Sequence, residues 1–230
     1  MACQRAQAHH QALMPPSIFD LFSHDSSGTE NLGAGAFLLR GFARTEAELL
    51  LKAVAGITAQ APFRHLLTPG GHVMSVAMTN CGELGWVSDE QGYRYSRHDP
   101  DNGQHWPDMP DIFLELAARA AEAAGYSGFI PDACLINCYT PGTRLTLHQD
   151  RNEHDTAAPI VSISLGVPAI FLWGGLQRGD TTQRHRLEHG DVAVWGGPSR
   201  FVFHGISPLQ EAWHPLTQAQ RINLTFRKAR

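Results

Sequence analysis

The order of apolar and polar positions divides the 230-residue chain at about residue 130. Beyond that point, short apolar runs alternate with turn dipeptides such as Pro141-Gly142 and Gly196-Gly197, a pattern typical of consecutive strands. The runs predict strands at 133–139, 144–148, 160–165, 169–173, 191–195, 201–204 and 221–226, and an earlier one at 35–40. So many short strands favour an α+β, mainly β fold built on a jelly-roll (double-stranded β-helix) core.

Before residue 130, two segments have the spacing of amphipathic helices. Residues 45–59 carry an apolar stripe that includes Leu49, and Thr45 with Glu48 three positions later forms a capping-box pattern. Residues 111–124 show a second apolar stripe with the same period. We therefore expect two helices that support the strands with one face each.

The segment between the two helices, 62–107, has a different character. It is rich in Gly, Met, Trp, Tyr, Arg and His and shows no sustained helical period, so short strands and turns fit it best. So many large, semi-polar side chains are more typical of a binding surface than of a core. Residues 1–30 predict a flexible extension, with an apolar patch at 18–22 that docks on the body. We expect one domain at 31–230, with a jelly-roll core at 130–228.

Composition is that of an ordinary globular protein, with 43% hydrophobic residues and a formal charge of −4. No apolar run approaches the roughly 20 residues that cross a bilayer, and the first residues lack a secretory signal, so we expect a cytoplasmic protein with no membrane partner. The negative charge argues against a nonspecific nucleic-acid binder but permits a local basic patch. The four cysteines, Cys3, Cys81, Cys134 and Cys138, lack a zinc or redox spacing and predict buried free thiols.

The strongest chemical signal is His148-Gln149-Asp150, followed far downstream by His204. Residues two apart on an extended strand leave the same face, so His148 and Asp150 are expected to converge. Two imidazoles and one carboxylate hold Fe(II) and leave positions open for O2 and a cosubstrate. The remaining histidines are expected in loops or on the surface: His9, His10, His24, His65, His72, His98, His105, His154, His185, His189 and His214.

Strand parity adds a second signal. Arg221, Asn223, Thr225 and Arg227 share one face of the last predicted strand. Two arginines on a buried face would need an anion, and a dicarboxylate such as 2-oxoglutarate would satisfy them. The alternative is an edge strand that turns this face to solvent. Alternate residues of an earlier strand, Leu135, Asn137 and Tyr139, present amide and phenol groups that could bind the same cosubstrate.

Several longer phrases resemble one known family. They include Thr68-Pro-Gly-Gly, Pro131-Asp-Ala-Cys-Leu-Ile-Asn137, Leu147-His-Gln-Asp150, Pro159-Ile-Val-Ser-Ile-Ser-Leu-Gly166 and Arg221-x-Asn-x-Thr-x-Arg227. Together they are similar to the AlkB family of Fe(II)/2-oxoglutarate-dependent dioxygenases, and the resemblance covers roughly residues 18–227. Segment 62–107 corresponds to the family's nucleotide-recognition lid.

The resemblance implies a role for each matching residue. The iron ligands, which are also the catalytic residues, would be His148, Asp150 and His204. The 2-oxoglutarate site would comprise Leu135, Asn137, Cys138, Tyr139, Leu145, Ser162, Arg221, Asn223 and Arg227. The alkylated nucleotide would meet Thr68, Met74, Ser75, Trp86, Tyr93, Arg94, Tyr95, Gln149, Arg151, Asn152 and Arg178.

The resemblance also implies the reaction. Decarboxylation of 2-oxoglutarate to succinate and CO2 would be coupled to hydroxylation of an N-linked methyl group, which leaves as formaldehyde. The substrates would be bases such as 1-methyladenine and 3-methylcytosine in single- or double-stranded DNA, or in RNA, held by a monomer. Trp86 would stack on the flipped base; the alternative, an ordinary core tryptophan, is disfavoured by the neighbouring Gly85 and the polar run Ser88-Asp89-Glu90.

Two features leave the function open. Position 152 is Asn152 where the bacterial member of the family has an acidic residue, so the preferred lesion is uncertain, and Arg144 and Arg151 replace lysines. The alternatives are a related dioxygenase acting on RNA, protein or a small molecule, a catalytically silent module that binds damaged strands, and a cupin-like metal store or sensor.

Overall fold

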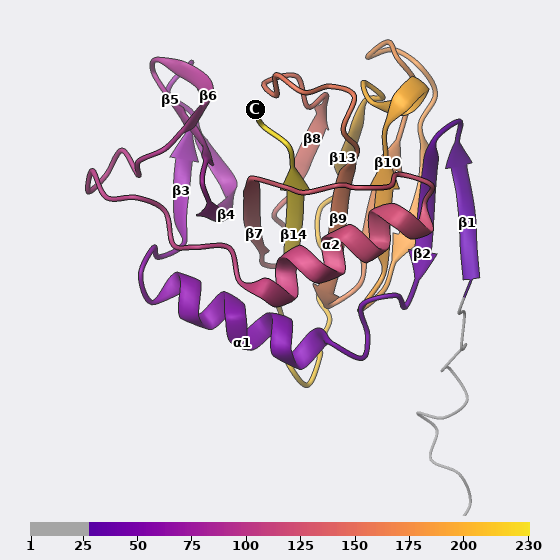
Figure 1. Cartoon of the computed structure of the whole chain (residues 1–230), viewed down its shortest axis with the longest axis horizontal. Coiled ribbons are helices and arrows are strands. Elements are labelled where there is room, and N and C mark those ends of the chain that lie inside the picture. Colours follow the sequence, from indigo (N-terminus) through magenta and orange to yellow (C-terminus); the bar gives the residue numbers. More distant parts are fainter. Residues whose placement is uncertain (1–27) are drawn as a thin grey trace, which may run out of the picture.

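The computed structural model describes residues 28–230, which form two facing β-sheets with two helices on the outside (Figure 1). The larger sheet has eight strands in the order β1-β2-β12-β9-β14-β7-β4-β3, and the smaller has four in the order β11-β10-β13-β8. A separate hairpin, β5-β6, stands beside them (magenta in Figure 1). The predicted patch at 18–22 and nearly all of the predicted extension lie outside the described residues.

The elements have the following bounds: β1 Gly28–Gly33, β2 Ala36–Arg40, α1 Ala47–Thr58, β3 Arg64–Leu67, β4 Val73–Gly82, β5 Gly85–Asp89, β6 Gly92–Ser96, α2 Asp111–Ala123, β7 Ala133–Tyr139, β8 Leu145–His148, β9 Ile160–Gly166, β10 Ala169–Trp173, β11 Gln183–Leu187, β12 Val192–Trp195, β13 His204–Ile206 and β14 Arg221–Arg227.

Two apolar cores hold these layers together. One packs α1 and α2 on the outer face of the large sheet and includes Leu50, Phe113 and Leu224. The other fills the space between the two sheets and includes Phe171 and Trp195. The strands of both sheets are therefore buried on their facing sides, and the predicted mainly β, jelly-roll architecture is confirmed.

Most predicted strands occur with their predicted bounds or within a residue or two of them, and β7 and β10 match at both ends. The strand predicted at 201–204 is wrong, because β13 begins only at His204. Outside segment 62–107, two strands were missed, β1 and β11. Both are sheet edges with mostly polar, exposed residues, so they lack the apolar signal on which the prediction rested.

Both helices occur, but the predicted capping box of α1 is wrong. The helix begins after Glu46, and no side chain caps it, because Thr45 lies in the preceding turn. Leu49 is 57% exposed rather than part of the apolar stripe. The second helix, α2, ends one residue earlier than predicted.

Segment 62–107 forms strands β3 to β6, in agreement with the short strands and turns that its sequence predicts, although one of these strands is long. Its strand β4 spans ten residues and pairs with β7, so that Cys81 lies opposite Cys134. This half of the segment extends the large sheet, and only the β5-β6 hairpin stands apart from it. The described cysteines Cys81, Cys134 and Cys138 are free and buried, as predicted. Neither helix in residues 28–230 is long and apolar enough to traverse a bilayer.

Candidate metal centre and cosubstrate pocket

The three predicted metal ligands converge at one end of the small sheet. His148 closes β8 and His204 opens β13, and the two residues are register partners, which brings their rings to 4.4 Å between centroids. Asp150 lies beyond the end of β8, in the following turn, so a shared strand face is not what aligns it with His148. The Nε2 atoms of His148 and His204 lie 3.7 and 3.8 Å from the carboxylate oxygens of Asp150. One ligand atom from each residue fits within 4.8 Å of the others.

Hydrogen bonds orient both imidazoles toward a metal. Nδ1 of His148 lies 2.9 Å from the Thr146 carbonyl oxygen, and Nδ1 of His204 lies 3.0 Å from that of Val202. A carbonyl oxygen can only accept, so each Nδ1 carries the proton and donates it. Each Nε2 therefore keeps a free lone pair that faces Asp150. This donor set, two neutral imidazoles and one carboxylate, fits Fe(II) with open coordination positions.

The electrostatics of the site favour the ligand form of each group. Burial, together with the nearby His148, lowers the pKa of His204 to about 4, so the imidazole is neutral at physiological pH. Burial alone would raise the pKa of Asp150, but the Arg227 guanidinium and the two histidines outweigh it and hold that pKa well below its usual range. Asp150 is thus a carboxylate under all physiological conditions.

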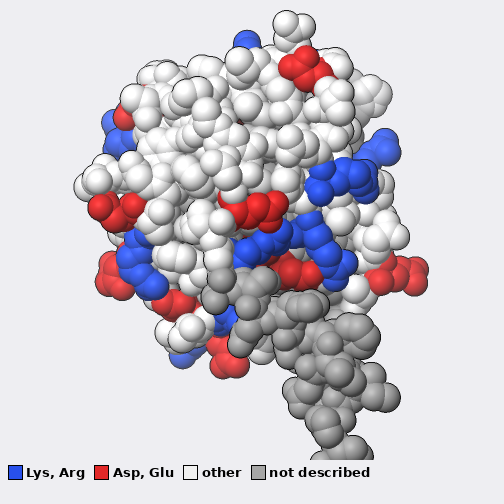
Figure 2. Space-filling view, turned by 90° about the vertical axis from the view of Figure 1, so that its right-hand side faces the viewer, with Lys and Arg blue, Asp and Glu red and all other residues white. Residues whose placement is uncertain are grey.

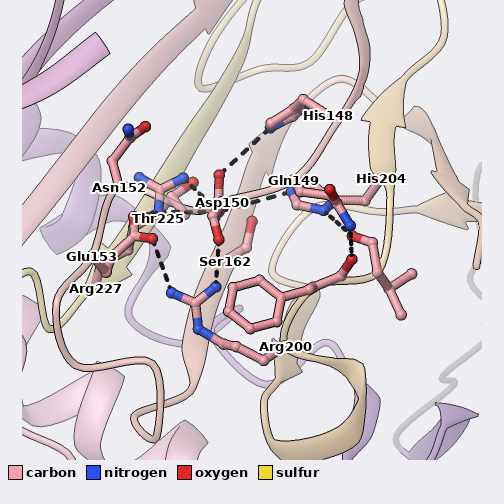
Figure 3. A network of polar contacts seen from close by, with 12 residues as sticks. His148, Gln149, Asp150, Asn152, Glu153, Ser162, Arg200, His204, Thr225 and Arg227 are labelled. Carbon is pink, nitrogen blue, oxygen red and sulfur yellow. Dashed lines mark hydrogen bonds and ion pairs between the residues drawn. The ribbon is translucent and has the colours of Figure 1, made fainter. Parts of the chain in front are cut away.

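Arg227 belongs to the metal site more than to a free anion pocket. Its Nη2 and Nε donate to Oδ2 of Asp150 at 2.9 and 3.1 Å. Its Nε also lies 3.5 Å from Glu153, which accepts a 3.0 Å hydrogen bond from Arg200 (Figure 3). Arg227 therefore has two carboxylate partners from the protein itself.

Arg221, at the other end of β14, has no such partner. It is 1% exposed and donates through Nη2 to Ser164 at 2.9 Å, while its guanidinium lies 4.9 Å from the Tyr139 ring centre. Its Nε and Nη1 are buried and find no hydrogen-bond partner among residues 28–230. Burial lowers the pKa of Arg221, yet a guanidinium stays charged. A buried, unpaired cation of this kind fits a ligand carboxylate.

A cavity of about 40 Å³ connects Arg221 with two of the metal ligands, His148 and His204. Of the predicted cosubstrate residues, those that line it are Leu145, Ser162, Arg221, Asn223 and Arg227. The edge-strand alternative for β14 is wrong, because β14 lies inside the eight-stranded sheet and all its residues are buried.

The predicted residues of β7 lie behind this wall. Asn137 donates from Nδ2 to Asn223 at 3.1 Å, and Tyr139 supports Arg221 through its ring. Leu135 belongs to the core between the sheets. Cys138 lies on the opposite side of the strand, in the core under the helices, so the structure does not bring its thiol to the cavity.

Sequence reasoning missed the aromatic wall of the pocket. Phe171 and Trp195 line the cavity, and the Trp195 ring lies 4.9 Å from His204 in an edge-on arrangement. The Nε1 of Trp195 is buried and has no hydrogen-bond partner in the described part of the chain. Alternation along β12, which turns Ala193 and Trp195 inward together, was a usable signal.

The predicted nucleotide-binding residues fall on the 62–107 segment and on the loops around the metal centre. Side chains of Ser75, Trp86 and Tyr95 join these two regions by hydrogen bonds. Ser75 Oγ donates to the Arg144 carbonyl at 3.1 Å, Trp86 Nε1 donates to Asn152 Oδ1 at 3.4 Å, and Tyr95 Oη donates to Glu153 at 2.6 Å. The turn that contains Asp150 therefore touches the β5-β6 hairpin directly.

Trp86 is half-buried rather than a core residue, and Tyr93 stacks on it with 5.5 Å between ring centres. The guanidinium of Arg94 is held by Asp89 of the same hairpin, which leaves it less free for a phosphate than expected. Thr68 accepts from the His72 amide within the β3-β4 turn, and Met74 packs on the core between the sheets.

The loops on the core side supply the remaining predicted residues. Gln149 donates to the carbonyl of Phe201, and Arg178 donates to that of Leu147 at 2.8 Å. Arg151 is exposed and lies over the Phe201 ring at 5.6 Å. Arg151 and Arg178 thus keep charge near the turn that carries Asp150.

The side of the molecule formed by β1, β2 and β11 has a different charge pattern. Positive and negative groups are interleaved on it (Figure 2), and Arg40 there pairs with Glu30 and with Asp191. Charges that pair locally create no extended field of one sign, so this side does not offer a phosphate-binding stripe.

Comparison with known proteins gives the family. Residues 35–227 match the 2OG-Fe(II) oxygenase superfamily. The chain is 56% identical over 212 residues to the α-ketoglutarate-dependent dioxygenase AlkB of Escherichia coli, covering 92% of this chain and 98% of that protein. An AlkB homolog of Caulobacter vibrioides is 46% identical over 182 residues, 79% of this chain and 81% of its own.

More distant relatives agree. The mouse nucleic acid dioxygenase ALKBH1 is 34% identical over 124 residues, which cover 54% of this chain and 31% of that protein. The solved structure of OsALKBH1 superimposes with a TM-score of 0.77 at 28% identity and covers 87% of this chain and 100% of its own. The chain therefore belongs to the 2OG-Fe(II) oxygenase superfamily and, within it, to the AlkB group of α-ketoglutarate-dependent dioxygenases.

Proposed function

We propose that this dioxygenase removes methyl groups from ring nitrogens of bases in nucleic acid. Single-stranded DNA is the proposed main substrate, with double-stranded DNA and RNA as further ones. The observation that carries the proposal is the contact between Trp86 and Asn152. It sets a half-buried aromatic surface beside the turn that holds Asp150, where a base stacked on the indole would present its edge to the metal centre.

His148, Asp150 and His204 would hold Fe(II), and the fit of their Nε2 and carboxylate atoms supports this role. Bound iron, with O2 and 2-oxoglutarate, supplies the oxidising power that converts an N-methyl group to a hydroxymethyl group, which then leaves as formaldehyde. The protein's own part is to keep Nδ1 protonated on both imidazoles and Asp150 ionised.

Arg221 would bind one carboxylate of 2-oxoglutarate, because it is the buried guanidinium on this wall with unpaired N–H groups. Ser162 and Asn223, which line the same cavity, would orient the cosubstrate. The pairing of Arg227 with Asp150 indicates that its main task is to fix the metal ligand, with any contact to 2-oxoglutarate secondary to it.

Trp86 and Tyr93 would hold the extruded base, since an enzyme that modifies a ring nitrogen must take the base out of the stack. Arg144, Arg151 and Arg178 would contact phosphates along the rim of the site. We propose that residues 31–230 work as one dioxygenase domain with 62–107 as lid and 130–228 as jelly-roll core, as a cytoplasmic monomer. The hydrogen bonds from Ser75, Trp86 and Tyr95 to the loops around the metal centre support this division.

The test is mass spectrometry of a single-stranded oligonucleotide containing 1-methyladenine, incubated with Fe(II), ascorbate, 2-oxoglutarate and the protein. We expect the methyl group to be lost, with formaldehyde and succinate formed in equal amounts. His148→Ala should abolish the reaction, whereas His154→Ala, an exposed histidine outside the metal site, should not. An unchanged oligonucleotide with verified iron loading would refute the proposal, and succinate formation with RNA, peptide or small-molecule panels would then identify the substrate class.

A further inference from the structure

The chain that leaves the β5-β6 hairpin folds into a second, smaller hairpin at residues 97–107. His98 and His105 are bridge partners in it, and the backbone amide of Asp99 donates to the Gln104 carbonyl at 2.8 Å. Because this bond joins the next residues of the two strands, His98 and His105 form a non-hydrogen-bonded pair, in which opposite side chains lie closest together. Their ring centroids are 4.4 Å apart.

The candidate metal centre provides a measure for this spacing. His148 and His204 are also antiparallel register partners, and their ring centroids are likewise 4.4 Å apart. The angle between the ring planes is 53° there and 41° for His98 and His105. The two pairs therefore share both their cross-strand placement and their ring separation.

The nitrogens of His98 and His105 are available to a ligand. Both side chains are exposed, and neither ring has a hydrogen bond or an ion pair within residues 28–230. A third pair, His189 and His214, is different, because its rings stack at 23° and each Nδ1 accepts from a backbone amide. Opposed imidazoles that carry protons repel each other, whereas a shared cation would hold them together.

The hairpin is fixed from below by the residues that follow the two histidines. Asp99 and Trp106 are both buried. Arg64 binds the two carboxylate oxygens of Asp99 at 2.6 and 2.7 Å and lies 5.4 Å from the centre of the Trp106 ring. The indole of Trp106 donates to the Ser96 carbonyl at 2.9 Å. The two imidazoles are thus held close before any ligand binds, which lowers the entropic cost of binding.

The surroundings of the pair suit a hydrated cation. A cavity of about 340 Å³ opens beside His105 and is lined mainly by polar groups, among them the carboxylates of Asp99 and Asp108. Asp108 is exposed and makes no ion pair with any other described residue. Of the arginines close in sequence or space, Arg64 is bound to Asp99 and Arg97 is exposed to solvent. Water ligands and an unpaired negative charge can therefore lie next to the pair.

We propose that His98 and His105 form a second metal site, which takes a borderline divalent transition ion such as Zn(II), Ni(II) or Cu(II). Imidazole suits these ions, whereas Mg(II) and Ca(II) take oxygen ligands. Within residues 28–230 no third His, Cys, Asp or Glu joins the pair in ligand geometry, so water completes the coordination shell. The ion ties together the two strands of the hairpin that follows β6.

The experiment counts the Zn(II) ions bound per chain by equilibrium dialysis at micromolar free Zn(II), with the metal measured by plasma mass spectrometry. Every protein, including the parent, carries Cys3→Ser, His9→Gln and His10→Gln, so that these side chains supply no ligands. Parallel dialysis against Mg(II) tests the class of ion. Folding of each protein is checked by its Tm.

We expect His98→Ala and His105→Ala each to bind one ion fewer than the parent, with an affinity for that ion at least about tenfold weaker, since loss of even an outer-shell partner costs that much. His72→Ala, another exposed histidine, is the matched control and should keep the parent count. His148→Ala, which alters the candidate metal centre, should keep the hairpin ion. Counts in His98→Ala and His105→Ala equal to that of the parent would overturn the proposal, and so would a hairpin ion that Mg(II) replaces equally well.

Discussion

Both arginines of β14 are buried, but replacing each by methionine should change the stability of the fold in opposite directions. Arg221 has two unpaired nitrogens, whereas Arg227 is bound to Asp150 and Glu153. Burying a charge costs several kcal/mol unless it is paired, and removing one member of a buried pair costs about 3–5 kcal/mol. In the protein without cosubstrate, Arg221→Met should therefore stabilise the fold, and Arg227→Met should destabilise it.

The magnitude for Arg221 follows from its contacts. The desolvation cost of several kcal/mol is offset in part by the contact with the Tyr139 ring, about 0.5–2 kcal/mol, and by the hydrogen bond to Ser164, about 1 kcal/mol. We take the net gain of Arg221→Met as about 2 kcal/mol, which raises Tm by roughly 4–8 °C in a domain of this size. Arg227→Met should lower Tm by roughly 10 °C.

The assay is thermal unfolding with Ni(II), with and without 2-oxoglutarate. At a hundred times its Kd the cosubstrate should stabilise the wild type by about 2.7 kcal/mol, and the Arg221→Met protein should lose that shift. The reasoning is refuted if Arg221→Met lowers Tm as Arg227→Met does and still responds to 2-oxoglutarate, because Arg221 would then be an ordinary structural residue.

Three further predictions address the lid, the pH dependence and the thiols. Trp86→Ala should weaken binding of a methylated oligonucleotide by about 1–3 kcal/mol and leave the Tm shift on adding 2-oxoglutarate unchanged. The control is Trp213→Ala, at a tryptophan that is 71% exposed on the β13-β14 loop, and it should change neither quantity. Equal losses of binding in both variants would argue against base stacking. Burial, with help from His214, lowers the pKa of His189 to about 4, below the value of 6.5 in the unfolded chain. The unfolded state then binds the proton first, so stability falls as pH drops from 6.5 toward 4, and His189→Gln should flatten this decline in urea titrations; identical curves would contradict the assignment. Burial and the neighbouring Cys81 raise the pKa of Cys134 well above its usual value, so a Cys3→Ser protein should show no reactive thiol with Ellman's reagent until it unfolds, and rapid labelling of the native protein would be inconsistent with the packing of β4 on β7.

The success of sequence reasoning depended on the kind of signal each element carries. Buried strands such as β7 and β10 can be identified from their mostly apolar runs, and their bounds were predicted correctly. The polar edge strands β1 and β11 lack that signal, since their pairing depends on a neighbouring strand rather than on their own side chains.

The sequence predicted which residues form the candidate site, but not which of them pair with one another. His148, Asp150 and His204 converge because β8 and β13 are register partners, a long-range fact that no local spacing contains. The same holds for the division of labour between Arg221 and Arg227, which parity placed together on one face. Asp150 lies beside the end of β14 that carries Arg227, so Arg227 is paired with it and Arg221, at the other end, is not.

The hydrogen bond from Tyr95 to Glu153 has a consequence for communication across the protein. Tyr95 belongs to β6, Glu153 contacts Arg227, and Arg227 binds Asp150, so a chain of four contacting side chains runs from the β5-β6 hairpin to Asp150. Displacing the hairpin alters the electric field at that ligand. Coupling between two sites is reciprocal. If a ligand bound under the hairpin changes the affinity of the site for its metal, the bound metal must change the affinity for that ligand by the same free energy.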